Sequence, residues 1–317
     1  MTRLSRRTLV SAALLAAGVA AAPRAFAEDK VFRIAYQKGG GILVLLKQRG
    51  TIAEKLKPLG WSVSWAEFPA GPQLLEALNV GVADFGPVGE APPIFAQAAG
   101  ADIVYAGSDP PSPKNEAIIV PKDSPIRTIA DLKGKRVALN KGSNVHYLLI
   151  QALETNGLAY GDIESVYLPP ADARAAFERG AVDAWVIWDP YYAAAELSLG
   201  ARTIADGTGL APNVSFYIAT RQITERHADV VTAALATIDN AEAWVRDNPG
   251  KAAAELAPIY GLPVEVVERF FTRSIFGAHR VDDATLTGQQ KVADAFAKLK
   301  LIPKPINVRD AAWKQPA

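Results

Sequence analysis

Two stretches of the chain share one alternation of apolar and polar positions. In the first, three leucines lie on one face of a predicted helix over residues 73–79, and a short apolar strand is predicted over 82–85. The glycine-rich segment 86–89 then predicts a bend, with Glu90 at the mouth of a second helix over 91–99. The predicted order is helix, strand, glycine loop and helix N-terminus.

The same order recurs about 100 residues later, with a strand predicted over 182–188 and a helix over 191–199. At an offset of 99 positions the matching pairs are Gly81 with Gly180, Asp84 with Asp183, and Glu90 with Asp189. The alternative is coincidence between two ordinary strand–helix units. Because ligands bind at the carboxyl ends of strands in open α/β sheets, we predict two similar lobes that each offer one loop to a shared cleft.

The remaining pattern extends this α/β prediction to the whole chain. Strands are predicted at 31–36, 61–68, 103–106, 116–120, 136–140, 166–168 and 214–219. Helices are predicted at 42–49, 145–156, 230–246, 251–260, 263–272 and 289–299. We expect two crossovers between the lobes and a ligand cleft between them. Lobe 1 comprises 28–118 and 215–317, whose C-terminal helices should cover it, and lobe 2 comprises 119–214.

Residues 1–27 are predicted to be a cleaved export signal. Arg6 and Arg7 lie in a twin-arginine pattern, and the apolar segment 9–22 precedes a small-x-small cleavage motif at 25–27. A retained membrane anchor is the alternative, but this apolar segment is too short to span a bilayer. We therefore expect a periplasmic mature chain that begins at Glu28.

Composition limits the possible partners and chemistry. The 317 residues carry a formal net charge of +1, and removal of the export signal with its four arginines leaves −3. Neither value suggests binding to nucleic acid or to an anionic membrane surface. The absence of cysteine excludes thiol nucleophiles, cysteine metal sites and a lipoprotein anchor. We expect a monomer with no cofactor and no metal site.

The predicted strands at 31–36 and 136–140 each lead through a glycine loop into a helix. Backbone N–H groups at such a junction lack helical partners and can bind an anion. The candidate donors at the cleft are Gln37, Gly89, Gly142, Ser143 and Asn144. Ser143 could instead serve only as a helix N-cap. Trp188, directly before Asp189, is the candidate for an apolar wall.

The sequence offers little for catalysis. It contains neither a G-x-S-x-G elbow nor an H-E-x-x-H motif. His146 lies in the first turn of its predicted helix and could face the cleft, although packing is the commoner role. Glu90 and Asp189 could meet across the cleft as a carboxylate pair, and an exported hydrolase that uses them is a remote alternative. We expect a binding protein and not an enzyme.

Several motifs together are specific to one family. They are YQKG (36–39), EFPAGPQLLEALNVG (67–81), GEAPPIFAQA (89–98), ADLKGK (130–135), KGS (141–143), HYLL (146–149), LPPADARAAFERG (168–180), AVDAW (181–185) and IWDP (187–190). With them, residues 31 to about 199 resemble the periplasmic aliphatic sulfonate-binding proteins of ABC importers, close to taurine- and nitrate-binding relatives. The C-terminal third resembles that family only loosely.

The resemblance implies a type II periplasmic binding fold that closes over a sulfonate, with an inner-membrane permease and its ATPase as partners. It implies a function in sulfur acquisition. The implied ligand-binding residues are Gln37, Val88, Gly89, Glu90, Gly142, Ser143, Asn144 and Trp188, with His146 and Asp189 beside them.

Three departures from the family pattern bear on ligand identity. Val88 stands where a hydroxyl residue is usual, Gly40 and Gly41 replace larger residues, and Asn144 replaces a small serine-like residue. Taurine, nitrate and sulfate esters therefore remain alternative ligands beside alkanesulfonates.

Overall fold

The computed structural model describes residues 30–38 and 41–314, so the predicted export signal lies outside the described residues. The first sheet has the order β2-β1-β3-β10-β4. Its strands are β1 (Val31–Gln37), β2 (Ser62–Phe68), β3 (Phe85–Val88), β4 (Ile103–Ser108) and β10 (Phe216–Thr220). β1 pairs in parallel with β2 and β3, whereas β10 runs antiparallel to β3 and β4.

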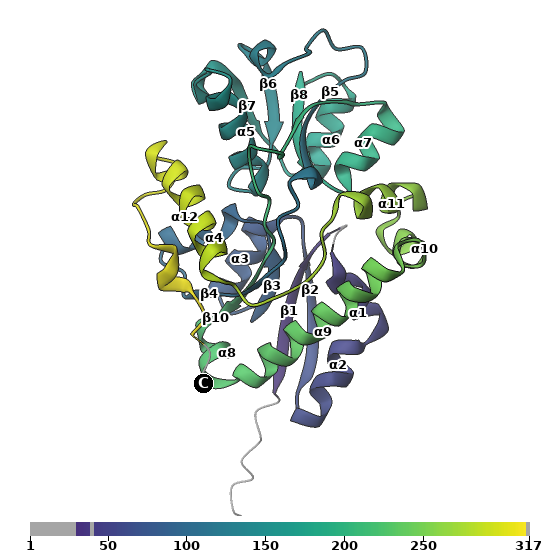
Figure 1. Cartoon of the computed structure of the whole chain (residues 1–317), viewed down its shortest axis with the longest axis vertical. Helices are drawn as coiled ribbons and strands as arrows, with labels where there is room; N and C mark the ends of the chain where they lie inside the picture. Colours follow the sequence, from purple (N-terminus) through teal and green to yellow (C-terminus); the bar gives the residue numbers. More distant parts are fainter. Residues whose placement is uncertain (1–29, 39–40, 315–317) are drawn as a thin grey trace, which may run out of the picture. The chain divides into compact units, whose positions relative to one another are not determined.

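The second sheet repeats this plan in the order β7-β6-β8-β5-β9. Its strands are β5 (Glu116–Val120), β6 (Arg136–Leu139), β7 (Glu164–Tyr167), β8 (Ala184–Trp188) and β9 (Arg202–Asp206). β6 is parallel to β7 and β8, and β5 is antiparallel to β8 and β9. Each sheet therefore receives its fourth strand, β10 or β5, directly after a crossover (Figure 1). The predicted two-lobe α/β fold is confirmed.

Helices surround both sheets. Those that follow strands of the first sheet are α1 (Ile42–Arg49), α2 (Thr51–Leu56), α3 (Gly71–Asn79) and α4 (Ala91–Ala98). Those of the second are α5 (Asn144–Thr155), α6 (Pro170–Glu178) and α7 (Tyr191–Leu199). The C-terminal part contains α8 (Arg221–Arg226), α9 (Ala228–Asp247), α10 (Pro249–Tyr260), α11 (Val264–Arg273) and α12 (Asp283–Lys298). None of the helices in the described part of the chain is long and apolar enough to cross a membrane.

The internal repeat has a physical basis in one aspartate–arginine hydrogen-bond group per lobe, which we call a bracket. Asp84 accepts hydrogen bonds from the backbone N–H and the guanidinium of Arg33, and its own N–H donates to the Arg33 carbonyl. Asp183 makes the equivalent bonds with Arg136 in the second lobe. Each bracket ties the residue before the central strand, β3 or β8, to the neighbouring parallel strand, β1 or β6, of the same sheet.

The third strand differs from its prediction. β3 comprises residues 85–88, so the segment 82–84 lies outside it and the predicted bend at 86–89 is largely strand. Val82 is 55% exposed and joins neither sheet. Gly86 is required by close packing, because a Cβ there would lie 2.7 Å from the Ala35 carbonyl oxygen.

The C-terminal helices contact elements of both lobes. Phe296 of α12 packs against Phe95 of α4 and His146 of α5, at ring distances of 4.9 and 5.7 Å. α12 also begins at Asp283, six residues before its predicted start, because Asp282 caps it by accepting from the Thr285 N–H. β5 pairs with the second sheet from Glu116 onward, so we propose that lobe 2 starts there and not at 119.

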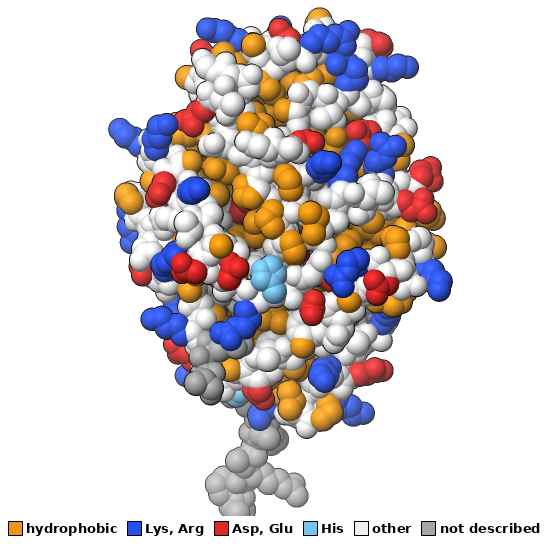
Figure 2. Space-filling view, viewed as in Figure 1, with side chains coloured by type: hydrophobic (Ala, Val, Ile, Leu, Met, Phe, Trp, Pro, Cys, Tyr) orange, Lys and Arg blue, Asp and Glu red, His pale blue; other side chains and the backbone are white. Residues whose placement is uncertain are grey.

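Charges of both signs are interspersed over the face shown in Figure 2, with apolar side chains gathered near its middle. This distribution presents no broad field of one sign on that face.

The two brackets predict unequal costs of removing their carboxylates. The Asp84 side chain is 7% exposed and that of Asp183 is 33% exposed. We expect Asp84→Ala to lower the free energy of unfolding by about 2–3 kcal/mol and Asp183→Ala by about 1 kcal/mol, because the side-chain hydrogen bonds of Asp84 are shorter and its carboxylate is better shielded from water. Urea denaturation of both variants measures this, and an equal loss would contradict the interpretation.

Candidate functional site

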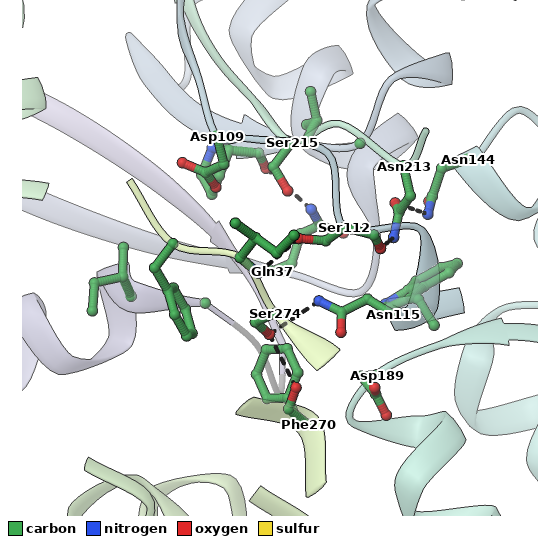
Figure 3. A pocket seen from close by; sticks show the side chains of 18 of the residues that line it. Gln37, Asp109, Ser112, Asn115, Asn144, Asp189, Asn213, Ser215, Phe270 and Ser274 are labelled. Atoms are coloured by element: carbon green, nitrogen blue, oxygen red, sulfur yellow. Dashed lines mark hydrogen bonds between the residues drawn. The ribbon is translucent and has the colours of Figure 1, made fainter. Parts of the chain in front are cut away.

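A cavity of about 170 Å³ lies where segments of both lobes meet. The first sheet contributes residues at the ends of β1 and β3, and the second contributes the start of α5 and the end of β8. The two crossovers and the segment after α11 complete the wall. The polar lining residues include Gln37, Asp109, Ser112, Asn115, Asn144, Asp189, Asn213, Ser215 and Ser274 (Figure 3).

Gln37 is the last residue of β1, and a hydrogen bond fixes its side chain. Its Nε2 donates to the Pro87 carbonyl at 3.0 Å, which fixes the amide at the cavity wall. Gly89 follows β3, and a Cβ there would lie 3.0 Å from Asn144 Oδ1. Glycine at this position therefore lets the β3 loop of lobe 1 approach the N-terminus of α5 in lobe 2.

Asn144 reaches the cavity, but other residues use both of its amide hydrogens. Nδ2 donates to Glu116 Oε2 at 2.6 Å and to Asn213 Oδ1 at 2.9 Å. An amide has two donor hydrogens, so in this arrangement the side chain has none left for an anion. Asn144 braces the two crossovers instead.

The crossovers supply site residues that the sequence analysis missed. Asn115 donates to Ser274 Oγ at 3.0 Å, while its buried Oδ1 has no hydrogen-bond partner among the described residues. Asn213 donates to the Ser112 carbonyl, and Ser112 Oγ accepts from the Ile275 N–H. The proline-rich loop at 110–113 was a visible signal of a stiff crossover, but nothing in the sequence indicates that it meets residue 274.

A second missed group lies on the same cavity wall. Tyr217 donates to Glu242 Oε1 at 2.8 Å, and the Gly277 N–H donates to Glu242 Oε2 at 2.7 Å. Asp109 is a third member of this group. Burial, followed by the charge of the nearby Glu242, raises the pKa of the Asp109 carboxyl well above its usual range. Burial also raises the pKa of Glu242.

The chain matches known proteins over nearly its whole length. The family model described as NMT1/THI5 like matches residues 63–252. A putative aliphatic sulfonates-binding protein of Escherichia coli (strain K12) is 45% identical over 313 residues, which cover 98% of this chain and 96% of that protein. A Bacillus subtilis (strain 168) protein with the same description is 32% identical over 89% of this chain and 85% of its own length.

Solved structures agree. The alkanesulfonate-binding protein SsuA from Xanthomonas axonopodis pv. citri, bound to MOPS, has a TM-score of 0.87 and 43% identity, and the match covers 90% of this chain and 99% of that chain. The periplasmic protein SsuA from Escherichia coli has a TM-score of 0.83 and 46% identity, with 90% and 93% covered. This chain belongs to the aliphatic sulfonate-binding protein family. The family consists of binding proteins, so the expectation of no enzyme is confirmed.

Six of the ten site residues that the sequence of this family member predicts line the cavity. They are Gln37, Val88, Gly89, Asn144, Trp188 and Asp189. Trp188 is half-buried and packs edge-on against Tyr191 at 6.5 Å. Whether these residues contact a ligand stays a prediction.

The other four candidates lie outside the cavity lining. Ser143 is buried and its Oγ donates to the Asn140 carbonyl at 2.7 Å, so it neither caps its helix by a side-chain bond nor faces the cavity. The Gly142 N–H donates to His146 Nδ1. His146 is fully buried, and desolvation followed by the charge of Lys141 lowers its pKa to about 4, which keeps the ring neutral.

Glu90 is fully buried beside the second crossover. Its Oε2 accepts from the Val214 N–H at 3.1 Å, and its carbonyl accepts from Gln289. Burial raises its pKa to about 8. Asp189 instead lines the cavity, accepts from the Ala193 N–H, and has its pKa raised to about 6, mainly by burial. The two carboxylates therefore do not form the pair in the cavity that a hydrolase would need.

The raised pKa of Glu90 predicts a pH dependence of stability. The folded state retains a proton that the unfolded state releases above about pH 4.5, so stability is lost as the pH rises from there to about 8. Glu90→Gln keeps an acceptor for Val214 without the ionisation. We expect its stability relative to the native chain to increase over this window, as measured by urea unfolding at pH 5 and 8; parallel pH profiles would contradict the assignment.

Proposed function

We propose that this chain is the substrate-binding component of an ABC importer and that it binds alkanesulfonates in the described cavity. The observation that supports this most directly is that the cavity wall has both a polar part and an apolar part. Amide and hydroxyl groups of Gln37, Asn115 and Ser112 lie on it together with the apolar surfaces of Trp188 and Phe276. A ligand with an anionic head and an apolar tail can satisfy both parts.

Neutral donors suit a sulfonate. A sulfonate is a permanent anion over the ordinary pH range, so its binding requires no proton transfer. Hydrogen bonds from neutral amides and hydroxyls are weaker than those from a guanidinium, which permits release to a permease. We further propose a periplasmic monomer that reaches its compartment by the twin-arginine route and delivers its ligand to a membrane permease driven by an ATPase.

A second candidate is an aminosulfonate such as taurine, and one observation favours it. Asp109 and Glu242 both line the cavity, and the charge of Glu242 is one of the causes that raise the pKa of Asp109. A ligand ammonium could compensate them. Comparison of 3-aminopropane-1-sulfonate with butane-1-sulfonate by calorimetry tests this directly, because the two differ mainly in the ammonium in place of a methyl group.

The first experiment on the proposed function is a calorimetric panel on residues 28–317. We expect butane-1-sulfonate, octane-1-sulfonate and MOPS to bind more tightly than sulfate or nitrate, since the inorganic ions cannot use the apolar wall. Butyl sulfate tests whether an ester replaces the sulfonate. Absence of binding by every sulfonate would overturn the proposal.

Trp188 should contribute through its apolar surface. We expect Trp188→Ala to weaken butane-1-sulfonate binding by about tenfold, as judged from the apolar area that its ring can bury. Trp65→Ala is the matched control, because Trp65 is a half-buried tryptophan of β2 outside the cavity lining. Equal losses in both variants would show that the effect is structural.

A further inference from the structure

Among the described residues, the charged partners of Arg273, the last residue of α11, all lie on the other lobe. Its Nη1 lies 3.4 Å from both carboxylate oxygens of Asp189, and its Nη2 bonds to Glu196 of α7. The guanidinium also covers the ring of Tyr192 at 3.8 Å from the centroid. The Arg273 side chain is 13% exposed and that of Asp189 is 1% exposed, so this ion pair is largely screened from water.

α11 itself is anchored in lobe 1. Its residues Val267, Phe270 and Phe271 belong to one buried apolar cluster with α9, α10 and the first sheet. The arginine therefore joins a helix of the lobe 1 core to α7 of lobe 2 and to Asp189 shortly before it. In Figure 1, α11 lies beside the lower end of α7, in agreement with these contacts.

Both ends of this ion pair are continuous with the cavity wall. On one side, the cavity is lined by Phe270, one helical turn before Arg273, and by the segment 274–276 that follows it. On the other side, Asp189 lines it together with the adjacent Trp188. A change in the distance between Arg273 and Asp189 would therefore change the distance between two walls of the site.

We propose that Arg273 is an interlobe latch, a positioning residue that holds the wall 270–276 against Trp188 and Asp189 and thereby sets how long a ligand stays bound. Separation of the walls leaves Asp189 without its buried cation, and an unpaired buried charge is costly. That cost adds to the barrier for ligand release. The inference rests on the proposed sulfonate binding, and its test has one readout that does not.

The test compares Arg273→Gln with Arg49→Gln. Arg49 makes the same kinds of contact, since it pairs with Glu255 and covers the Trp244 ring at 3.9 Å, but this pair is more exposed and all three residues belong to lobe 1 elements. We expect Arg273→Gln to raise the dissociation rate of butane-1-sulfonate about tenfold in stopped-flow tryptophan fluorescence, with little change in the association rate. Arg273→Lys should restore part of the loss, and Arg49→Gln should change neither rate.

Small-angle scattering of the ligand-free proteins provides the independent readout. The latch predicts a larger radius of gyration for Arg273→Gln than for the native chain and for Arg49→Gln. If no sulfonate binds the native chain, the proposed function fails, but the scattering still tests the latch. Equal radii of gyration for Arg273→Gln and the native chain would then overturn the latch as well. If Arg273→Gln does not fold, Glu196→Gln removes one partner of Arg273, together with the 3.6 Å ion pair of Arg269 on the same helix, and keeps Asp189 paired. It should raise the dissociation rate by a smaller factor, and an unchanged rate together with an unchanged radius would overturn the latch.

Discussion

The buried side-chain amide of Asn144 joins the two crossovers between the lobes. Its two hydrogens bond to Glu116 at the start of β5 and to Asn213 just before β10, so one side chain holds both crossovers at the N-terminus of α5. Asn213 in turn donates to the Ser112 carbonyl. A buried polar network of this kind is stable only when its members are satisfied together. The relative position of the crossovers therefore depends on all of these bonds at once.

The same network explains why the crossovers contribute to the site. Each sheet takes its fourth strand from a crossover, and the residues just outside β5 and β10 must therefore pass between the lobes. Polar groups in these segments form the hydrogen bonds that hold the crossovers in place. Among them, Ser112, Asn115 and Asn213 consequently line the cavity. The side chains that brace the crossovers are therefore also the ones that the proposed ligand would meet in this region.

The charged groups follow a related division. Glu90 and Glu116 are fully buried carboxyls whose pKa values are raised by burial. The pKa of Glu90 is raised to about 8, so this carboxyl acts mainly as a neutral hydrogen-bonding group near neutral pH. Asp189 is buried too, but Arg273 lowers its pKa against the effect of burial. The equivalent positions of the internal repeat, Glu90 and Asp189, have thus diverged into a protonated brace and one half of an interlobe ion pair.

The sequence by itself determined the two-lobe α/β fold, because hydrophobic periodicity and glycine stops are local signals and the repeat doubled them. It also indicated Gln37, Gly89 and Trp188, which stand at strand ends where any open sheet exposes its loops. Only the tertiary structure decided that Ser143 and His146 turn away from the cavity, since the phase of a helix depends on what packs against it. Only the tertiary structure brought Asn115 to Ser274 and Asp189 to Arg273, because pairings between residues so far apart in the chain follow from how the lobes pack and leave no periodic pattern.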